Sequence, residues 1–333
     1  MNPLAVTMGE PAGIGPETAL QAWIQRLPRD VPPFFLLGDP DHLAHLARLL
    51  GYAVPIVVTE AGRAAEMFPL ALPVVPLDMA VIAEPGQPNA ADAPAVIESI
   101  RRAVTLVHTG HASALVTSPI AKAPLLRAGF PHPGHTEFLG ALTEELYGVP
   151  ARPVMMLWTA ELAVVPVTVH IPLAEVPKKL SRELIVETAR IVAKDLAARF
   201  GILHPRLAFA GLNPHAGEDG ELGKEDASVI APAIADLRAE GIDASGPYPA
   251  DTLFHEAARS RYDAVLAMYH DQALIPIKTL AFDKAVNVTL GLPFVRTSPD
   301  HGTAFDIAGT GKADPSSLIA ALKLAARLSE HAA

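Results

Sequence analysis

Residues 262–311 have the sequence YDAVLAMYHDQALIPIKTLAFDKAVNVTLGLPFVRTSPDHGTAFDIAGTG, and this stretch decides the fold. The uncharged run 264–268 is typical of a buried strand, and polar residues including His270 and Asp271 follow it at once. Open α/β sheets bind their ligands at the carboxyl ends of the strands. The stretch therefore predicts an α/β fold with a functional site at the end of this strand.

The rest of the chain alternates apolar strands with amphipathic helices. We predict strands at residues 4–8, 34–38, 53–58, near Val74, and at 114–116, 154–158, 162–169 and 207–210. We predict helices at about 41–50, 93–108, 181–200, 228–240 and from about 315 onwards. This alternation is typical of βαβ units. The turn at residues 9–17, GEPAGIGPE, opens a helix but lacks the GxGxxG spacing of a dinucleotide-binding turn.

The composition excludes several classes of protein. With 333 residues, 50% of them hydrophobic, the chain can bury a sizeable core, and its length favours about two domains. A formal net charge of −10 argues against non-specific nucleic-acid binding, which needs clustered Lys and Arg. Because the chain has no cysteine, any metal must be bound by His, Asp or Glu. We see no signal peptide and no apolar run of membrane length, so we expect a cytoplasmic protein that contacts neither membrane nor nucleic acid.

Three histidines occupy the same place relative to three predicted strands. His170 follows 162–169, His215 comes just after 207–210, and His270 comes just after 264–268. Because the ends of parallel strands share one edge of a sheet, the three imidazoles can converge on zinc or a similar divalent ion. Asp271 and Asp251 are carboxylates that could orient them. Because the chain has 13 histidines, any one of the three taken singly fits a hydrogen-bonded structural role better than a ligand role, and the common placement of all three favours the metal site.

Two further turns contain groups suited to an anion. The segment FPHPGHTEF, residues 130–138, predicts a helix capped by Thr136. The exposed N–H groups at the start of this helix suit a substrate anion. The turn TSPIAK, residues 117–122, ends in Lys122, which is either a substrate cation or a solvated lysine of the first helical turn; taken alone, the residue favours the solvated lysine. The chain has neither a GxxxxGK[ST] nor a GxSxG motif, which argues against nucleotide and serine hydrolases.

Taken together, the motifs resemble those of the 4-hydroxythreonine-4-phosphate dehydrogenase family over nearly the whole chain. They are TMGEPAGIGPE, TSPIAK, GHTEF, VTVHIPL, GLNPHAGEDG, GPYPADT, YDAVLAMYHDQ and VNVTLGLPFVRTSPDHGTAFDIAG, in that order. The resemblance implies two α/β/α domains flanking a cleft, as in isocitrate and isopropylmalate dehydrogenases, and not the Rossmann fold. It implies a cofactor-binding domain of residues 1–127 plus 275–333 and a metal-, substrate- and dimer-forming domain of residues 128–274.

The resemblance also implies an activity. Members of the family use NAD or NADP to oxidise the secondary alcohol of 4-phosphohydroxy-L-threonine, in pyridoxine 5′-phosphate biosynthesis. The β-keto acid product decarboxylates to 3-amino-2-oxopropyl phosphate. One divalent metal ion, zinc, magnesium or cobalt, is implied. The family is a homodimer with the active site at the subunit interface, which implies that His170 or another of the three histidines completes the site of the neighbouring subunit.

The site residues of the family match positions in this chain. The implied metal ligands are His170, His215 and His270, and the implied substrate contacts are His135, Thr136, Lys278, Asn287 and Arg296. The implied cofactor loop contains Asp300, His301, Gly302, Asp306 and Gly309. The candidates for the general base are Lys278 and Asp251.

Three departures from the family pattern bear on the substrate. Glu10, Ala121 and Ala273 stand where Asp, Asn and Gly are usual in the family. The alternatives within the enzyme class are metal-dependent dehydrogenases of erythronate 4-phosphate or of an aromatic dihydrodiol carboxylate. Outside it, a phosphotransacetylase-like acyltransferase would need no metal, and a non-catalytic metal-binding protein would reduce no NAD.

Overall fold

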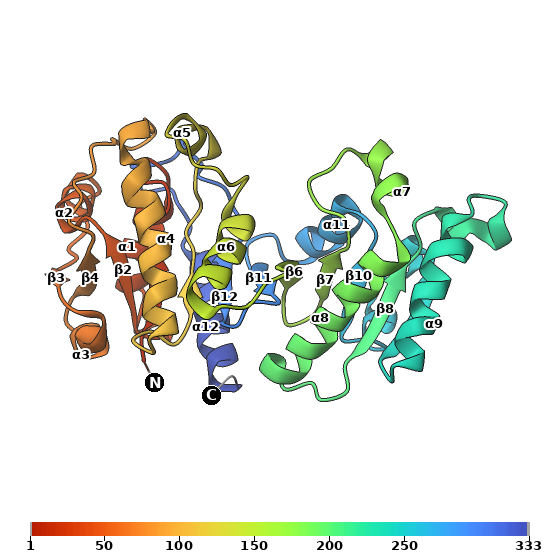
Figure 1. Cartoon of the computed structure of the whole chain (residues 1–333). Helices are drawn as coiled ribbons and strands as arrows, with labels where there is room; N and C mark the ends of the chain where they lie inside the picture. The colour runs from red at the N-terminus through yellow and green to blue at the C-terminus, as the bar shows by residue number, and fades with distance from the viewer. Residues whose placement is uncertain (1, 332–333) are drawn as a thin grey trace. The chain divides into compact units, whose positions relative to one another are not determined.

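Alternating strands and helices build two α/β units in the computed structural model, which describes residues 2–331 (Figure 1). The first unit comprises the chain up to Pro153 together with Leu292–His331, and the second comprises Val154–Gly291. The chain thus leaves the first unit once and returns to it near its end. The predicted α/β class with more than one unit is confirmed.

A parallel sheet forms the centre of the first unit. Its strands are ordered β3-β4-β2-β1-β5-β12, and every neighbouring pair in this group is parallel. Strands β1, β2 and β5 are buried throughout, which explains why they appear in the sequence as continuous apolar runs. The bounds are β1 Leu4–Thr7, β2 Phe34–Gly38, β3 Ile56–Val58, β4 Leu72–Pro76, β5 Leu115–Val116 and β12 Arg296–Pro299.

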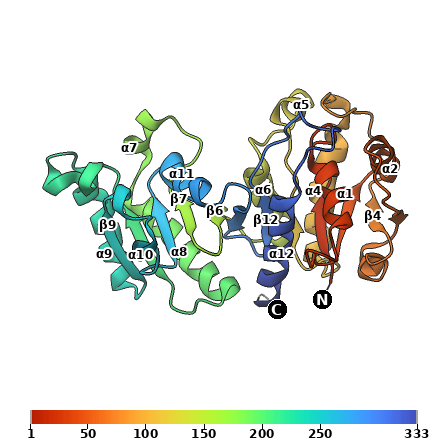
Figure 2. The ribbon, with the colours of Figure 1, turned by 180° about the vertical axis from the view of Figure 1, so that it is seen from behind.

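Two helices pack side by side on one face of this sheet. They are α1 (Gly15–Ile24) and α12 (Ser316–His331), seen in red and dark blue in Figure 2. The inner face of α12 is fully buried and includes Leu318, Leu322, Ala325 and Leu328. The shorter helices of this unit are α2 Pro40–Leu49, α3 Ala64–Met67 and α5 Lys122–Arg127.

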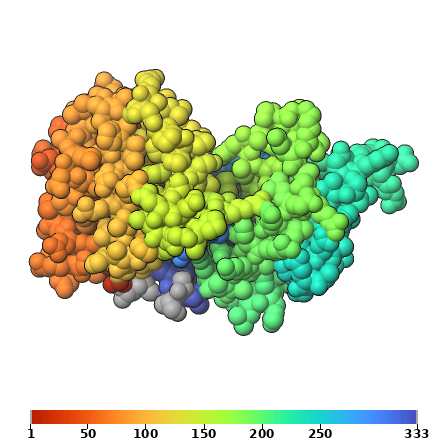
Figure 3. Space-filling view, viewed as in Figure 1, coloured from red at the N-terminus to blue at the C-terminus, as the bar shows by residue number. Residues whose placement is uncertain are grey.

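The other face of the first sheet is covered by α4 (Ala93–His108) and α6 (His135–Tyr147), which lie together on the side seen in Figure 3. The bounds of α4 are as predicted. Ile100 and Val104 of α4 are buried against the sheet, whereas Ile97 and Val107 are half buried beside the core. Helix α6 begins at His135, and its N-cap residue is Gly134. The prediction that Thr136 caps this helix is therefore wrong, because the extended Gly134 already takes the N-cap conformation.

The second unit has a mixed sheet ordered β11-β6-β7-β10-β8-β9. The pairs β11 with β6 and β6 with β7 are antiparallel, and the pairs joining β7, β10, β8 and β9 are parallel. The bounds are β6 Val154–Trp158, β7 Ala163–Pro166, β8 Arg206–Ala210, β9 Asp243–Tyr248, β10 Ala264–Ala267 and β11 Val286–Leu290. The parallel strands β7, β10 and β8 are neighbours, as the histidine hypothesis requires.

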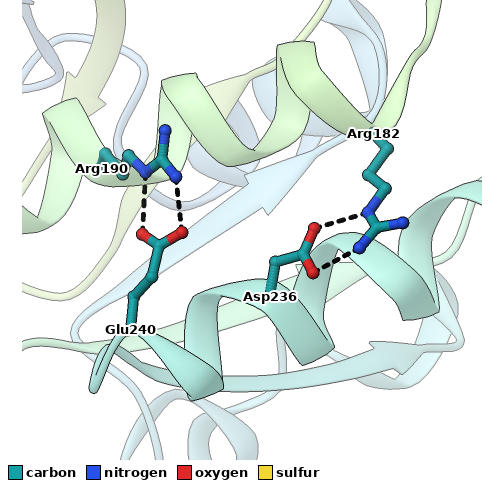
Figure 4. Close-up of polar contacts among 4 residues, drawn as sticks. All are labelled: Arg182, Arg190, Asp236 and Glu240. Atoms are coloured by element: carbon teal, nitrogen blue, oxygen red, sulfur yellow. Dashed lines mark hydrogen bonds and ion pairs between the residues drawn. The ribbon is translucent and has the colours of Figure 1, made fainter.

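Helices α8 (Arg182–Phe200) and α9 (Ala231–Ala239) pack together on one face of this sheet. Two exposed ion pairs join them, Arg182 with Asp236 and Arg190 with Glu240 (Figure 4). The other face is covered by α11 (His270–Ala281), whose apolar side packs on β7 and β10. Two short helices, α7 Val176–Lys179 and α10 Glu256–Arg259, complete the unit. Helix α9 starts later than predicted because Asp226–Ile230 forms a π-helical turn.

The division between the units falls later in the chain than the predicted boundaries at 127/128 and 274/275. Helix α6 packs against α4 and therefore belongs to the first unit. Helix α11 packs on β7 and β10, and β11 pairs with β6, so both belong to the second unit. Within residues 2–331, no helix is long and apolar enough to span a membrane.

Candidate active site

Two of the three predicted histidines lie side by side at the edge of the second sheet. His170 follows β7 and His270 follows β10, and the centroids of their rings are 5.4 Å apart. The pairing of the two strands continues to their ends, where Thr168 Oγ1 donates to the carbonyl of Met268 at 2.7 Å. Parallel neighbours with matched ends therefore bring the two imidazoles together.

His270 is held in an orientation suited to a ligand. It is the first residue of α11, and its Nδ1 lies 2.8 Å from Oδ1 of Asp271. A carboxylate there accepts the Nδ1–H, which leaves Nε2 with the lone pair that binds a metal. His170 and His270 line a cavity of about 200 Å³ together with Thr168 and Tyr269.

His215 lies in a left-handed turn after β8. The residues from His215 to Asp219 all have positive φ, and four of these five are not glycine. His170 also has a positive φ, of 34°. Such conformations are costly for side-chain-bearing residues and are concentrated at functional sites. The backbone of two of the three histidines is therefore held in a strained state by its surroundings.

Asp226, a buried residue that no sequence motif indicated, holds the loop before this turn. Its Oδ1 accepts the N–H of Leu212 at 2.8 Å, and its Oδ2 accepts the N–H and Nδ2 of Asn213 at 3.2 and 2.9 Å. The π-helical turn positions this carboxylate under the loop. These contacts join residues that are 13 and 14 positions apart in the chain, and only the folded loop brings them together. No sequence motif therefore indicates them.

His215 opens into a second cavity of about 400 Å³, lined also by Asn213, Asp251 and Tyr269. Tyr269 lines both cavities, so the two are neighbours. Gln272 lines the second cavity and connects the ends of β10 and β8. Its Oε1 accepts the N–H of Met268 after β10, and its Nε2 donates to the carbonyl of Gly211 after β8, both at 2.7 Å. Asp251 is exposed on the short turn Ala250–Thr252.

The donor atoms suit a divalent metal ion, but one copy of the chain assembles only part of a ligand set. Imidazole nitrogens oriented by a carboxylate are ligands that zinc and similar ions prefer. In the part of the chain that the structure describes, no three His, Asp or Glu side chains are grouped to hold a metal ion. His170 and His270 are adjacent, while His215 stands in the neighbouring cavity.

The first unit contains a buried cationic group. Arg296, the first residue of β12, is 4% exposed, and its Nε and Nη2 both donate to Oγ1 of Thr117, at 3.1 and 2.6 Å. Burial lowers the pKa of Arg296 to about 10, so the guanidinium keeps its charge at neutral pH. An enclosed positive charge of this kind is suited to binding an anion.

His135 lies beside this arginine at the start of α6. Burial, and secondarily the charge of Arg296, lowers the pKa of His135 to about 3. The imidazole is therefore neutral, and its buried Nε2 has no hydrogen-bond partner among the described residues. The N-terminus of α6 has no side-chain cap, so the N–H groups of its first turn, which includes Thr136, are available to an anion.

The side chain of Lys122 lies near Gly134, at the start of α6. A Cβ added to Gly134 would stand 3.8 Å from Cε of Lys122 and 3.5 Å from Oε2 of Glu137. The lysine is exposed at the first turn of α5. This exposure fits the solvated lysine that the sequence favoured.

The remaining predicted substrate contacts belong to the second unit. Lys278 is half buried on α11, with Nζ 5.4 Å from the ring centroid of Phe282. Asn287 lies on β11, and its Oδ1 is buried without a hydrogen-bond partner among the described residues. An unsatisfied buried amide oxygen in a native fold is typical of a ligand-binding position.

The predicted cofactor loop is tied to the turn that opens α1. Glu17 is fully buried, and its two carboxylate oxygens accept the N–H groups of Gly309 at 2.9 Å and Ala313 at 3.3 Å. The N–H of Ile14 donates to the carbonyl of Thr303 at 2.9 Å. Glu17 thus fixes the end of the loop at residues 309–313.

Within this loop the predicted residues differ in exposure. Gly302 and Asp306 are exposed, whereas Asp300, His301 and Gly309 are partly buried. Gly309 has φ +73°, and a Cβ there would stand 2.6 Å from Cβ of Pro85, so only glycine fits. The role of this loop in cofactor binding stays a prediction.

Comparisons with known proteins agree with the motifs. A family model described as pyridoxal phosphate biosynthetic protein PdxA matches residues 30–325. A 4-hydroxythreonine-4-phosphate dehydrogenase from Methylorubrum extorquens is 62% identical over 334 residues, covering 100% of this chain and 96% of the relative. The crystal structure of a 4-hydroxythreonine-4-phosphate dehydrogenase from Klebsiella pneumoniae superposes with a TM-score of 0.86 at 36% identity, covering 99% of this chain and 100% of that one.

A second kind of enzyme shares the fold at greater distance. A terephthalate 1,2-cis-dihydrodiol dehydrogenase from Burkholderia xenovorans superposes with a TM-score of 0.64 at 28% identity, covering 97% of each chain. Both the TM-score and the sequence identity are lower than those of the Klebsiella enzyme. Family model, full-length identity and fold therefore place this chain in the PdxA family of pyridoxal phosphate biosynthetic proteins.

Proposed function

We propose that this protein is a 4-hydroxythreonine-4-phosphate dehydrogenase. It uses NAD or NADP to oxidise the secondary alcohol of 4-phosphohydroxy-L-threonine, and the β-keto acid loses carbon dioxide to give 3-amino-2-oxopropyl phosphate. The full-length relative at 62% identity supports the substrate. The observation that carries the proposal is the buried Arg296 beside the neutral His135 at an uncapped helix start.

This group is suited to the phosphate of the substrate. Arg296 offers a planar fork of N–H donors, and the first turn of α6 offers backbone N–H groups and the positive end of the helix dipole. His135 and Thr136 add neutral hydrogen-bonding groups, so the phosphate is bound without titration of the histidine near neutral pH. Lys278 and Asn287, which belong to the second unit, are proposed as substrate contacts from the resemblance to the family alone.

The proposed metal ligands are His170, His215 and His270. A divalent ion bound there would supply Lewis acidity toward the substrate oxygens. The three histidines would hold this ion, and Asp271 keeps His270 in the tautomer that presents Nε2. The proton of the reacting hydroxyl passes to a side chain for which Asp251 and Lys278 are the candidates. Asp251 lines the cavity of His215, which favours it over a group outside that cavity.

We propose a homodimer in the cytoplasm whose second copy completes the histidine site. Exposed apolar side chains flank the cavity of His170 and His270: Val169 and Ile171 are each 37% exposed, and Leu173 is 66% exposed. Apolar residues at the rim of a site are typical of a covered surface. His215 stands apart from the other two histidines within one copy, and a residue from the neighbouring copy would then complete the ligand set.

The test is reduction of NAD or NADP, followed by absorbance, with 4-phosphohydroxy-L-threonine in the presence and absence of a chelator. Reduction that the chelator abolishes supports substrate, cofactor and metal together. Arg296→Ala should raise KM for this substrate far more than KM for the dinucleotide, while Arg102→Ala on the exposed side of α4 should change neither. Equal effects on the two KM values would contradict the role of Arg296.

A second candidate is a dehydrogenase of a dihydrodiol carboxylate, favoured by the likeness to the Burkholderia enzyme. A carboxylate would also satisfy Arg296. Reduction with such a substrate, and none with 4-phosphohydroxy-L-threonine, would select it. The same assay with erythronate 4-phosphate separates a change of substrate from a loss of activity.

A further inference from the structure

Thr117 at the carboxyl end of β5 is a residue of the anion group to which the proposed function assigns no role. It is 1% exposed, and its Oγ1 accepts both the Nε–H and an Nη2–H of Arg296. We propose that Thr117 is a positioning residue, which fixes the guanidinium of Arg296 in the orientation that binds the substrate phosphate. The inference rests on the proposed role of Arg296 in substrate binding.

The strand register explains why these two side chains meet. Strands β5 and β12 are parallel, with Leu115 opposite Arg296 and Val116 opposite Thr297. Because successive side chains of a strand alternate between faces, Thr117 lies on the same face as Leu115 and Arg296. Thr297 points the other way, and its Oγ1 donates to the carbonyl of Ala321 in α12.

The backbone around Thr117 is itself fixed. The N–H of Thr117 donates to the carbonyl of Thr297 at 3.0 Å, and the N–H of the following Ser118 donates to Oγ1 of Thr7 at 3.1 Å. Thr117 is thus held between two strands of the sheet. Its hydroxyl offers the arginine a rigid acceptor.

The type of acceptor matters for an anion site. Arginine has a long side chain, and two N–H groups bound to one fixed oxygen restrict both the position and the plane of the guanidinium. A threonine hydroxyl is neutral, so it holds the cation without cancelling its charge, whereas a carboxylate would compete with the phosphate. Orientation before binding reduces the entropy that is lost when the substrate binds.

The experiment compares Thr117→Val, which keeps the shape and removes the hydroxyl, with Thr117→Ser, which keeps the hydroxyl. Thr117→Val should raise KM for 4-phosphohydroxy-L-threonine roughly tenfold or more, the range for losing a hydrogen bond to a charged group, with little change in KM for the dinucleotide. Thr117→Ser should recover most of this loss. Thr105→Val is the matched control, because the hydroxyl of Thr105 bonds only within α4 to the carbonyl of Arg101.

A double-mutant cycle tests whether Thr117 acts through Arg296. In the Arg296→Ala background, adding Thr117→Val should leave KM for the substrate unchanged, because the group that it positions is gone. A merely structural role would lower activity further and raise both KM values. The inference is overturned by additivity in this cycle, or by equal kinetics of the Val variant and the wild-type protein.

Failure of the proposed function has a different signature. If the wild-type protein reduces no dinucleotide with this substrate, calorimetry with inorganic phosphate tests the same group directly. Weaker phosphate binding by Thr117→Val, recovered by Thr117→Ser, supports the positioning role at a site for another anionic substrate. No phosphate binding by the wild-type protein, together with no turnover, overturns both proposals.

Discussion

Arg296 and His135 show how burial sets the chemistry of single residues in this protein. The same enclosure that keeps Arg296 from water also lowers the pKa of His135 to about 3, and the neighbouring positive charge acts in the same direction. A histidine at this position is therefore a neutral hydrogen-bonding group and not a second cation. Substrate binding by this pair should be insensitive to pH near neutrality on account of His135.

The first prediction concerns the cost of keeping His135 neutral. Its pKa is 6.5 when unfolded and lower when folded, so the stability it contributes is fully present above pH 6.5 and is lost as pH falls toward 3. The unfolding free energy of the wild-type protein should fall between pH 7 and pH 4. In His135→Asn this fall should be smaller by about 1 kcal/mol, a value that takes the partial exposure of His135 into account. Denaturant titrations at the two pH values measure this, and an unchanged difference would contradict the neutral state.

At the scale of elements, two segments of the candidate site are held by buried carboxylates from elsewhere in the chain. Asp226 fixes the loop that leads into the left-handed turn of His215, and Glu17 fixes the end of the loop 300–313. Each carboxylate accepts backbone N–H groups that would otherwise be buried without partners. The loops thus depend on a helical segment for their shape.

The second prediction tests Asp226. Asp226→Asn replaces one acceptor oxygen by a donor that opposes the N–H groups of Leu212 and Asn213, so we expect a loss of about 1–3 kcal/mol in unfolding free energy. The value of kcat/KM should fall with it, because His215 loses its position. Glu225→Gln is the matched control, because the carboxylate of Glu225 accepts Nδ2 of Asn213 but not the backbone N–H groups of Leu212 and Asn213, so its effect on both quantities should be much smaller. A stable Asp226→Asn protein with unaltered kinetics would remove Asp226 from the site.

The third prediction tests Glu17. Glu17→Gln keeps the shape but leaves the N–H of either Gly309 or Ala313 facing a donor. We expect KM for the dinucleotide to rise severalfold while KM for the phosphorylated substrate changes little, on the order of the cost of one buried hydrogen bond. Glu330→Gln, at an exposed position of α12, is the control. A rise in KM for the substrate alone would show that the loop does not bind the cofactor.

At the scale of the whole molecule, the second unit has an apolar rim around a histidine cavity, and one copy groups two of the three expected ligands. In the proposed homodimer, the second copy would cover this rim and complete the ligand set. A surface of this kind is costly to leave in water, and its burial stabilises association by roughly 25 cal/mol for each Å² of apolar surface removed from water.

The fourth prediction follows from this. Leu173→Glu places a charge on the exposed apolar rim, so we expect a shift from dimer to monomer in light scattering, together with loss of turnover and of bound metal. Leu27→Glu alters an equally exposed leucine of the first unit, which is 76% exposed, and should change none of these. A dimer that persists in Leu173→Glu with full activity would place the interface elsewhere.

The sequence alone predicted most of the helices and strands, because buried parallel strands are continuous apolar runs, while the roles of the motif residues that follow them stay predictions. It predicted β2 and α4 to the residue and placed His170, His215 and His270 after neighbouring strands. The capping of α6 was wrong, because Gly134 and Thr136 are both good caps by type and only the backbone conformation distinguishes them. The boundaries between the units depend on which sheet α6 and α11 pack against, and periodicity does not show that.

Tertiary structure decided the contacts between segments that are far apart in the chain. Thr117 meets Arg296 across 179 positions, and Glu17 meets Gly309 across 292. The register of a parallel sheet and the packing of a loop on a helix create these pairs, and neither leaves a local pattern. The residue types of the site were therefore written in the sequence, while their partners, their burial and the resulting pKa values came only from the fold.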